Sequence, residues 1–266
     1  MTRFWLTCFL CVFLTVSAFA KGIGYSVPDK LAKQASGKNT ESVVALAKYF
    51  NEHLKTDEQK ARAAAMFIVY QMEKDGYREK RAQEAGLKNQ PLKPLADINE
   101  PLKTRIGTSA DFAKLFQQLT TEMGLESKII TGYAGKKIPT KRLSQQAIQT
   151  TARALNPNVD TTNYQLQPYE ASWNAVKVNG TWKLVDTYWM IMGAGAGKAL
   201  KTDNDWLRFI GSRLKNPPKF DELSKGKRID GTYFFTDPRV MIKTHFPTDE
   251  TDQLLKSPVS WIQFTK

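Results

Sequence analysis

The stretch Glu170–Trp189, EASWNAVKVNGTWKLVDTYW, decides the fold of this chain. In it, two runs of alternating apolar and polar residues, Ala175–Val178 and Trp182–Val185, flank the dipeptide Asn179-Gly180. Asn-Gly between such runs is the strongest short-range signal for a two-residue β-hairpin with a type I′ turn. The sequence therefore predicts an antiparallel hairpin centred on this turn.

The register of the hairpin places an acidic side chain close to position 171. With a two-residue turn at Asn179-Gly180, Val178 lies opposite Thr181. Continued pairing would put Asp186 opposite Trp173 and make Ala171 its diagonal neighbour on one face, roughly 7–8 Å away. A histidine at position 171 could give its ring N–H to Asp186, as the base and its orienting acid do in a nucleophile triad. Because the chain has alanine there, the hairpin resembles a catalytic ribbon without its base.

Residues 1–20 have the pattern of a secretory signal peptide. Arg3 precedes an apolar run that ends in Ala18-Phe19-Ala20, just before Lys21. This A-x-A end predicts cleavage between Ala20 and Lys21, and hence a secreted or periplasmic protein without a stable transmembrane segment. The alternative is an uncleaved anchor, because the run is about as long as a membrane span. We expect residues 21–54 to form an extension with a first helix, followed by one domain over 55–266.

Composition narrows the chemistry that the mature chain can use. Cys8 and Cys11 are the only cysteines and lie in the signal segment, so we expect no thiol nucleophile and no disulfide. His53 and His245 are isolated histidines, and we predict no metal site and no cofactor. A net charge of +13 favours anionic surroundings such as envelope polymers or acidic proteins. The basic residues are dispersed and no nucleic-acid motif accompanies them, so nucleic acid is not an expected partner.

Apolar periodicity and turn residues predict the elements around the hairpin. Residues 21–39 are expected to be a poorly ordered lead-in, and 80–103 a crossing loop. The long connection 136–167 is typical of a lid or a binding loop. We predict helices over Glu41–Leu54, Asp57–Lys74, Ala110–Met123 and Asp203–Leu214. We predict strands over Lys128–Tyr133 and Tyr233–Phe235, and the start of a further helix at Asp237-Pro238.

Three short motifs carry a resemblance to a known family. They read Arg105-Ile-Gly107-Thr-Ser109-Ala-Asp-Phe112-Ala113, then Ala171-Ser172-Trp173-Asn174, then Val185-Asp186-Thr187-Tyr188-Trp189. In this order and spacing, and with the later segments Tyr233–Pro238 and His245–Pro247, they resemble the transglutaminase-like superfamily, in particular its kyphoscoliosis-peptidase-type branch. The family motifs have cysteine where this chain has Ser109 and histidine where it has Ala171.

The resemblance implies an α+β fold with a papain-like core, in which helices pack on an antiparallel sheet. It also implies that Ser109, Ala171 and Asp186 occupy the positions of a catalytic triad of which only the aspartate is retained. A serine hydroxyl ionises far less readily than a thiol and needs a base within hydrogen-bond reach, which alanine cannot provide. Loss of a nucleophile or base typically lowers the rate on the order of 10⁴–10⁶-fold.

Three functional hypotheses follow. The first is an exported, catalytically inactive protein that binds a peptide, a protein or an anionic envelope polymer in a groove formed by Arg105, Trp173, Asn174, Trp189 and His245. The second is a remodelled hydrolase or acyl transferase that uses Ser109, with Glu170, Asp186 or His245 as a displaced base. The third is a cationic surface-interaction protein in which charge dominates binding.

Overall fold

The computed structural model describes residues 25–84, 93–135, 170–192, 196 and 200–264. Among these, a five-stranded antiparallel sheet with the order β8-β5-β4-β3-β9 forms the centre of the molecule. Its strands are β3 (Ser127–Ala134), β4 (Glu170–Val178), β5 (Thr181–Val185), β8 (Phe234–Thr236) and β9 (His245–Pro247). Short pairs, β1 (Glu73–Lys74) with β2 (Ile106–Gly107) and β6 (Ile191–Met192) with β7 (Arg228–Ile229), lie outside it.

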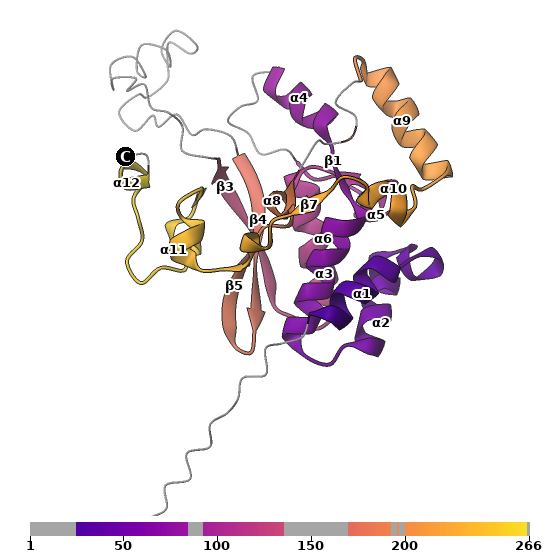
Figure 1. Cartoon of the computed structure of the whole chain (residues 1–266). Coiled ribbons are helices and arrows are strands. Elements are labelled where there is room, and N and C mark those ends of the chain that lie inside the picture. The colour runs from indigo at the N-terminus through magenta and orange to yellow at the C-terminus, as the bar shows by residue number, and fades with distance from the viewer. Residues whose placement is uncertain (1–24, 85–92, 136–169, 193–195, 197–199, 265–266) are drawn as a thin grey trace, which may run out of the picture.

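Helices cover both faces of this sheet (Figure 1). On one side lie α1 (Ser26–Gln34), η1 (Gly37–Thr40), α2 (Val43–His53), α3 (Asp57–Gln71) and α6 (Ser109–Glu122). On the other side lie α11 (Pro238–Met241) and α12 (Trp261–Phe264). The remaining elements are α4 (Gly76–Glu84), α5 (Asn99–Thr104), α8 (Thr187–Met190), α9 (Asp203–Lys215), α10 (Phe220–Ser224), η2 (Gly231–Tyr233) and η3 (Glu250–Gln253). No helix in the described ranges has the length and apolar character needed to cross a membrane.

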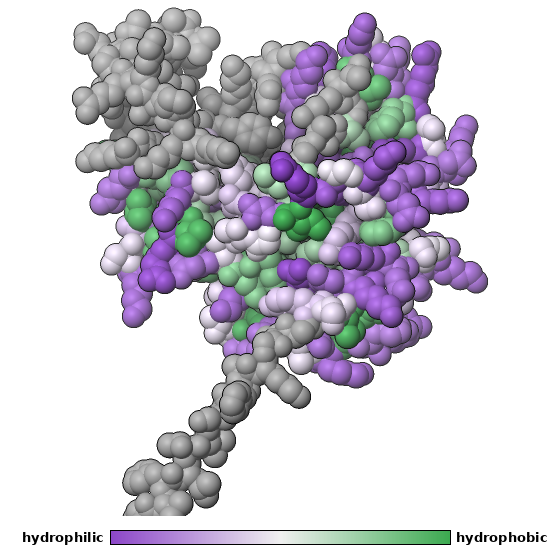
Figure 2. All heavy atoms as spheres, viewed as in Figure 1, coloured by the Kyte–Doolittle hydropathy of each residue, from purple (hydrophilic) through white to green (hydrophobic). Residues whose placement is uncertain are grey.

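The main core lies between the helices and one face of the sheet. Alternation along β4 sends Val176 and Val178 toward α3 and α6, where they join Phe67, Phe112 and other buried side chains. Ala171, Trp173 and Ala175 of the same strand point to the opposite face and pack with Met241 of α11. Figure 2 shows hydrophilic side chains spread widely over the helical side of the molecule. β4 therefore carries buried apolar side chains on both of its faces.

The hairpin prediction is confirmed in its turn and in most of its register. Asn179 and Gly180 have φ values of 48° and 77°, as a type I′ turn requires, and Val178 pairs with Thr181. The pairing stops at Asn174 and Val185, however, so the predicted extension to Asp186 is wrong. The backbone N–H of Asp186 donates instead to Tyr233 O at 2.9 Å, and the chain turns into α8.

Two segments that were predicted to lack regular structure contain helices. The expected lead-in carries α1, because Leu31 and Ala32 are buried against the core and Asp29 pairs with Arg62 of α3 at 2.7 Å. The expected crossing loop carries the end of α4 and all but the last residue of α5. In both segments tertiary burial outweighs a polar composition. The predicted signal peptide and the connection 136–167 lie outside the described residues.

The carboxyl end of α3 is held by a lysine from a distant part of the chain. Lys227 Nζ donates to the carbonyls of Val69 and Tyr70, each at 3.1 Å, and to the carbonyl of Met72. The last carbonyls of a helix have no partner within the helix, and a cation there also complements the helix dipole. Lys227 therefore caps the central helix of the core.

We expect Lys227→Met to lower the free energy of unfolding by about 2 kcal/mol, because it keeps the aliphatic stem but leaves these carbonyls unpaired. Urea denaturation followed by tryptophan fluorescence would measure this loss. Lys225→Met, at an exposed position two residues earlier, is the matched control and should change the free energy by less than about 0.5 kcal/mol. Equal effects of the two variants would show that the cap contributes nothing.

Candidate functional site

Ser109 is the first residue of α6, the position that the family resemblance assigns to a nucleophile. Thr108 caps this helix, and a capping box joins Thr108 to Asp111. Phe112 and the following apolar residues at helical spacing bury α6 against the sheet. Ser109 is thereby held rigidly at the helix start, where its side chain is 4% exposed.

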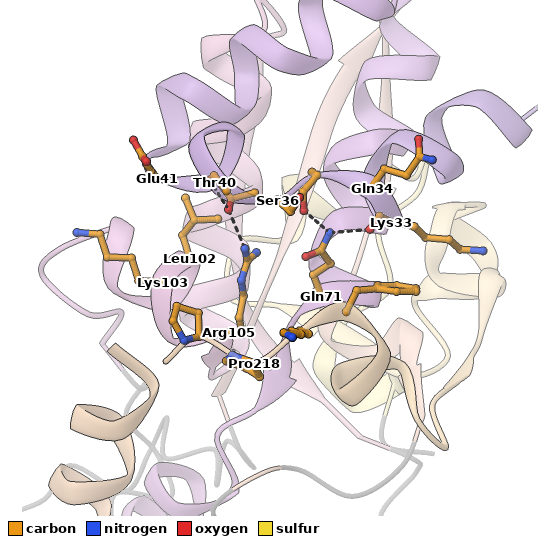
Figure 3. Close-up of a pocket in the computed structure, with 15 residues that line it drawn as sticks. Lys33, Gln34, Ser36, Thr40, Glu41, Gln71, Leu102, Lys103, Arg105 and Pro218 are labelled. Carbon is orange, nitrogen blue, oxygen red and sulfur yellow. Dashed lines mark hydrogen bonds between the residues drawn. The ribbon is translucent and has the colours of Figure 1, made fainter. Parts of the chain in front are cut away.

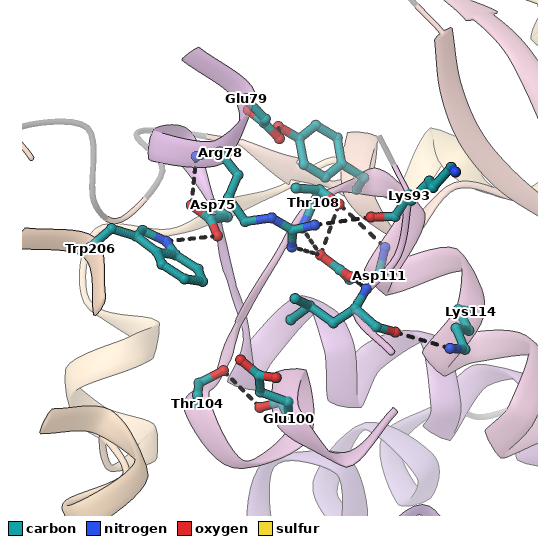
Figure 4. A network of polar contacts seen from close by, with 12 residues as sticks. Asp75, Arg78, Glu79, Lys93, Glu100, Thr104, Thr108, Asp111, Lys114 and Trp206 are labelled. Atoms are coloured by element: carbon teal, nitrogen blue, oxygen red, sulfur yellow. Dashed lines mark hydrogen bonds and ion pairs between the residues drawn. The ribbon is translucent and has the colours of Figure 1, made fainter. Parts of the chain in front are cut away.

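Asp111 gathers the polar contacts around this helix start (Figure 4). Its carboxylate accepts four hydrogen bonds of 2.7–2.8 Å, from Arg78 Nη1, the backbone N–H of Leu95, and the N–H and hydroxyl of Thr108. Arg78 in turn donates from its backbone N–H to Asp75 at 3.0 Å. Burial raises the pKa of the Asp75 carboxyl. The positive end of α6 is therefore already occupied by a fully buried carboxylate.

Asp186 is bonded to His245, a partner from the other end of the sheet. His245 Nε2 lies 2.9 Å from one carboxylate oxygen of Asp186, and the other oxygen accepts the backbone N–H of Trp189 at 2.8 Å. The second ring nitrogen, Nδ1, lies 2.8 Å from Thr244 Oγ1. Asp186 and His245 are each 1% exposed. Both ring nitrogens of His245 and both carboxylate oxygens of Asp186 thus have partners.

Close strand packing brings His245 to this place. It begins β9, which pairs with β3 so that His245 lies opposite Ala134 and Pro247 opposite Gly132. A Cβ atom on Gly132 would lie 2.2 Å from the carbonyl oxygen of Phe246, so glycine is needed for β9 to approach. The absence of a side chain at one position of β3 therefore allows the histidine to reach Asp186.

Three aromatic rings surround the imidazole of His245. The ring centroids of Trp173, Trp189 and Tyr233 lie 5.1, 4.8 and 5.6 Å from it. The two tryptophans present their rings edge-to-face, an arrangement that stabilises aromatic pairs beyond the area they bury. Trp173 and His245 are buried and Trp189 is partly exposed. The structure thus brings together Asp186 and three of the residues predicted to form a groove.

The other predicted residues lie elsewhere. Ala171 is opposite Gly132 in the β3–β4 pair, is 3% exposed and shares a face with Trp173. Asn174 points to the opposite face, where its Nδ2 donates to the carbonyl of Ala113 in α6 at 2.9 Å. Arg105 contributes to a pocket on the helical side of the molecule. Within the described ranges, no group of three or more His, Cys, Asp and Glu side chains is placed to hold a metal ion.

The Asp186–His245 bond was not predicted from the sequence. Two features of the sequence could have indicated this bond. A buried aspartate requires hydrogen-bond partners, and His245 is the one histidine that lies in an apolar stretch, next to Phe246 and Pro247. Sequence spacing does not reveal that β9 lies beside β3.

The chain is similar to several known proteins. The profile of the transglutaminase-like superfamily matches residues 29–187. Human kyphoscoliosis peptidase is 27% identical over 209 residues, which is 79% of this chain and 24% of that protein. Hillarin from Drosophila melanogaster is 28% identical over 154 residues, covering 56% of this chain and 14% of hillarin. The crystal structure of a TGase has a TM-score of 0.33 and 12% identity, covering 70% of this chain and 39% of that one.

The chain therefore spans about a quarter or less of the length of these two curated relatives. The match to the family profile and the similarity to kyphoscoliosis peptidase confirm the resemblance expected from the three motifs. The helices packed on an antiparallel sheet confirm the predicted α+β class. This chain belongs to the transglutaminase-like superfamily.

Proposed function

We propose that this chain is an exported, catalytically inactive transglutaminase-like protein that binds a peptide, a protein or an anionic envelope polymer without turning it over. The observation that carries the proposal is the bonding of His245: its ring nitrogens are engaged by Asp186 and Thr244. With alanine at position 171, Asp186 has His245 as its partner, and the family's base position holds a side chain that cannot accept a proton.

The hydrogen bonds of His245 assign its tautomer. A carboxylate can only accept, so Nε2 carries the proton that bonds to Asp186. In a neutral ring, Nδ1 is then the acceptor, and its lone pair points to the hydroxyl of Thr244. A general base needs this lone pair directed at the nucleophile's proton. The geometry therefore argues against His245 as a displaced base for Ser109, which was one form of the hydrolase hypothesis.

The electrostatics at the start of α6 also argue against Ser109 as an ionised nucleophile. A helix N-terminus promotes ionisation of a nucleophile because its dipole favours negative charge. At α6 the Asp111 carboxylate already uses that end, two residues after Ser109. An alkoxide at Ser109 would lie close to this buried negative charge, which disfavours its formation. Low exposure of Ser109 also restricts access by a substrate.

Activity assays on residues 21–266 would test the proposal. We expect no measurable peptidase, amidase or cross-linking activity toward a casein substrate, and no labelling of Ser109 by a serine-reactive fluorophosphonate. Activity that disappears in Ser109→Ala would overturn the proposal. A binding assay with casein peptides, repeated at about 0.5 M salt, separates the modes of recognition, because exposed charges are then screened within about 4–5 Å. Loss of binding at this salt concentration would favour the cationic surface-interaction hypothesis.

One contact favours a second candidate function, a hydrolase with a different nucleophile. Thr244, His245 and Asp186 form a hydroxyl–imidazole–carboxylate series with contacts of 2.8 and 2.9 Å. Thr244 is partly exposed, unlike Ser109. In the same assays, activity that survives in Ser109→Ala and is lost in Thr244→Ala would establish this candidate. Absence of activity in the unsubstituted chain would exclude it for the substrates used.

A further inference from the structure

A pocket of about 600 Å³ lies among helices of the chain, and Figure 3 shows the residues that line it. It lies between the end of α1, η1, the end of α3, α5 and the segment that leads into α10. Its volume is in the range of small-molecule sites. Neither Ser109, Ala171, Asp186 nor His245 lines it. The triad positions and this pocket are therefore separate features of the molecule.

Arg105 lines this pocket, with 6% of its surface exposed, and its side chain extends toward Thr40 (Figure 3). It ends α5 in the left-handed conformation, with a φ of 59°, which is uncommon for a residue with a side chain. Arg213 of α9 fixes this turn by donating to the carbonyls of Thr104 and Arg105 at 3.1 and 3.3 Å. The backbone is thus held in a conformation that sends the arginine side chain inward.

The charge of Arg105 is poorly compensated within the described part of the chain. Its Nη2 donates to Thr40 Oγ1 at 3.0 Å, and its guanidinium lies 5.0 Å from the ring centroid of Phe67. Nε and Nη1 are buried and make no hydrogen bond there, and no carboxylate of the described residues pairs with the group. Burial lowers the pKa of Arg105 to about 10. A buried cation without an anion is costly, so this site favours a negative ligand.

The rest of the pocket defines what else the ligand needs. Leu102, Pro217, Pro218 and Phe220 provide apolar walls. Exposed lysines at positions 33, 103 and 219 add positive charge at the rim. Among the described residues of the lining, Glu41 is the one acidic side chain, and it points away from Arg105 (Figure 3). The amide of Gln71 is committed to the backbone, donating to Ala32 O at 2.7 Å and Ala35 O at 2.8 Å.

We infer that this pocket binds a small organic carboxylate, with its charged end at Arg105 and its apolar body against Leu102 and Phe220. A purely inorganic anion would leave these apolar walls exposed to water. An uncharged apolar molecule would leave the positive charge of Arg105 without a counter-charge. The rim lysines raise the local concentration of anions at the mouth of the pocket. This inference does not depend on whether Ser109 or Thr244 has catalytic activity.

Three probes on the chain of residues 21–266 test the inference by amide chemical-shift titration. Hexanoate has both a negative charge and an apolar chain. Hexanol has an apolar chain of the same length without the charge, and inorganic phosphate has negative charge without an apolar chain. We expect hexanoate to bind at least ten-fold more tightly than hexanol and phosphate, and to shift the amides of Ala35, Gly37 and Leu102. Equal affinities for hexanoate and hexanol, tighter binding of phosphate, or shifts confined to other residues would overturn it.

Variants then separate the two halves of the site. Arg105→Met should lower the affinity for hexanoate at least ten-fold, to the affinity for hexanol. The variant should remain folded, because methionine replaces a poorly compensated buried cation with an apolar side chain of similar length. Phe220→Ala should weaken hexanoate and hexanol alike by about five-fold, by removing apolar contact. Lys103→Met, at the exposed rim, is the matched charge control and should change the affinity less than three-fold. Unchanged hexanoate binding by Arg105→Met would refute the site.

Discussion

We expect His245→Ala to lower the free energy of unfolding by about 3–5 kcal/mol, the largest effect of a single substitution that this structure predicts. The variant leaves the buried Asp186 carboxylate without the imidazole N–H that now lies 2.9 Å away. It also empties a space between Trp173, Trp189 and Tyr233, whose rings pack on the imidazole. Urea denaturation monitored by tryptophan fluorescence would measure the loss, since two of these rings are the reporters.

The second histidine of the chain provides the control. His53 lies exposed on α2, where its Nδ1 is 2.8 Å from the Tyr49 carbonyl. His53→Ala should therefore change the free energy by less than about 0.5 kcal/mol. A double-mutant cycle of His245→Ala with Asp186→Asn would isolate the bond between the two side chains. A coupling energy near zero, or a loss below about 1 kcal/mol in His245→Ala, would contradict a stabilising role for this pair.

We expect Asp111→Ala to lower the free energy of unfolding by about 3 kcal/mol. The substitution removes four hydrogen bonds to a fully buried carboxylate, including the ion pair with Arg78. Bonds to charged groups are worth about 1.5–3 kcal/mol each, but the hydration of the carboxylate in the unfolded chain offsets part of their sum. Urea denaturation would measure the loss, and hydrogen exchange should show earlier opening of α4 and α6.

The chain supplies a matched control in a second capping box of the same type. Thr202 and Asp205 cap α9 with the same pair of backbone bonds, but at a solvated position. Asp205→Ala should therefore lower the free energy of unfolding far less than Asp111→Ala, because it removes only a solvated helix cap. If the two variants were equally stable, the buried contacts of Asp111 with Arg78 and Leu95 would contribute nothing beyond capping.

Local signals in the sequence were sufficient for much of the fold. Asn179-Gly180 determined the hairpin turn because few other residues tolerate two successive positive φ values. Thr108, followed by Asp111 and apolar residues at helical spacing, determined the start and the buried face of α6. The three motifs around Ser109, Ala171 and Asp186 were sufficient to identify the family. In the first two of these cases the decisive contacts lie within a few residues.

Contacts between distant segments were decided only by the tertiary structure. The helix α1 forms in a lead-in that is polar on average because α3 buries its short apolar side. The Asp186–His245 bond joins residues 59 positions apart and depends on β9 pairing with β3. The pocket at Arg105 likewise needs four separate segments of the chain to meet. Local backbone preferences act over a few residues, whereas the partner of a buried charge depends on how the whole chain packs.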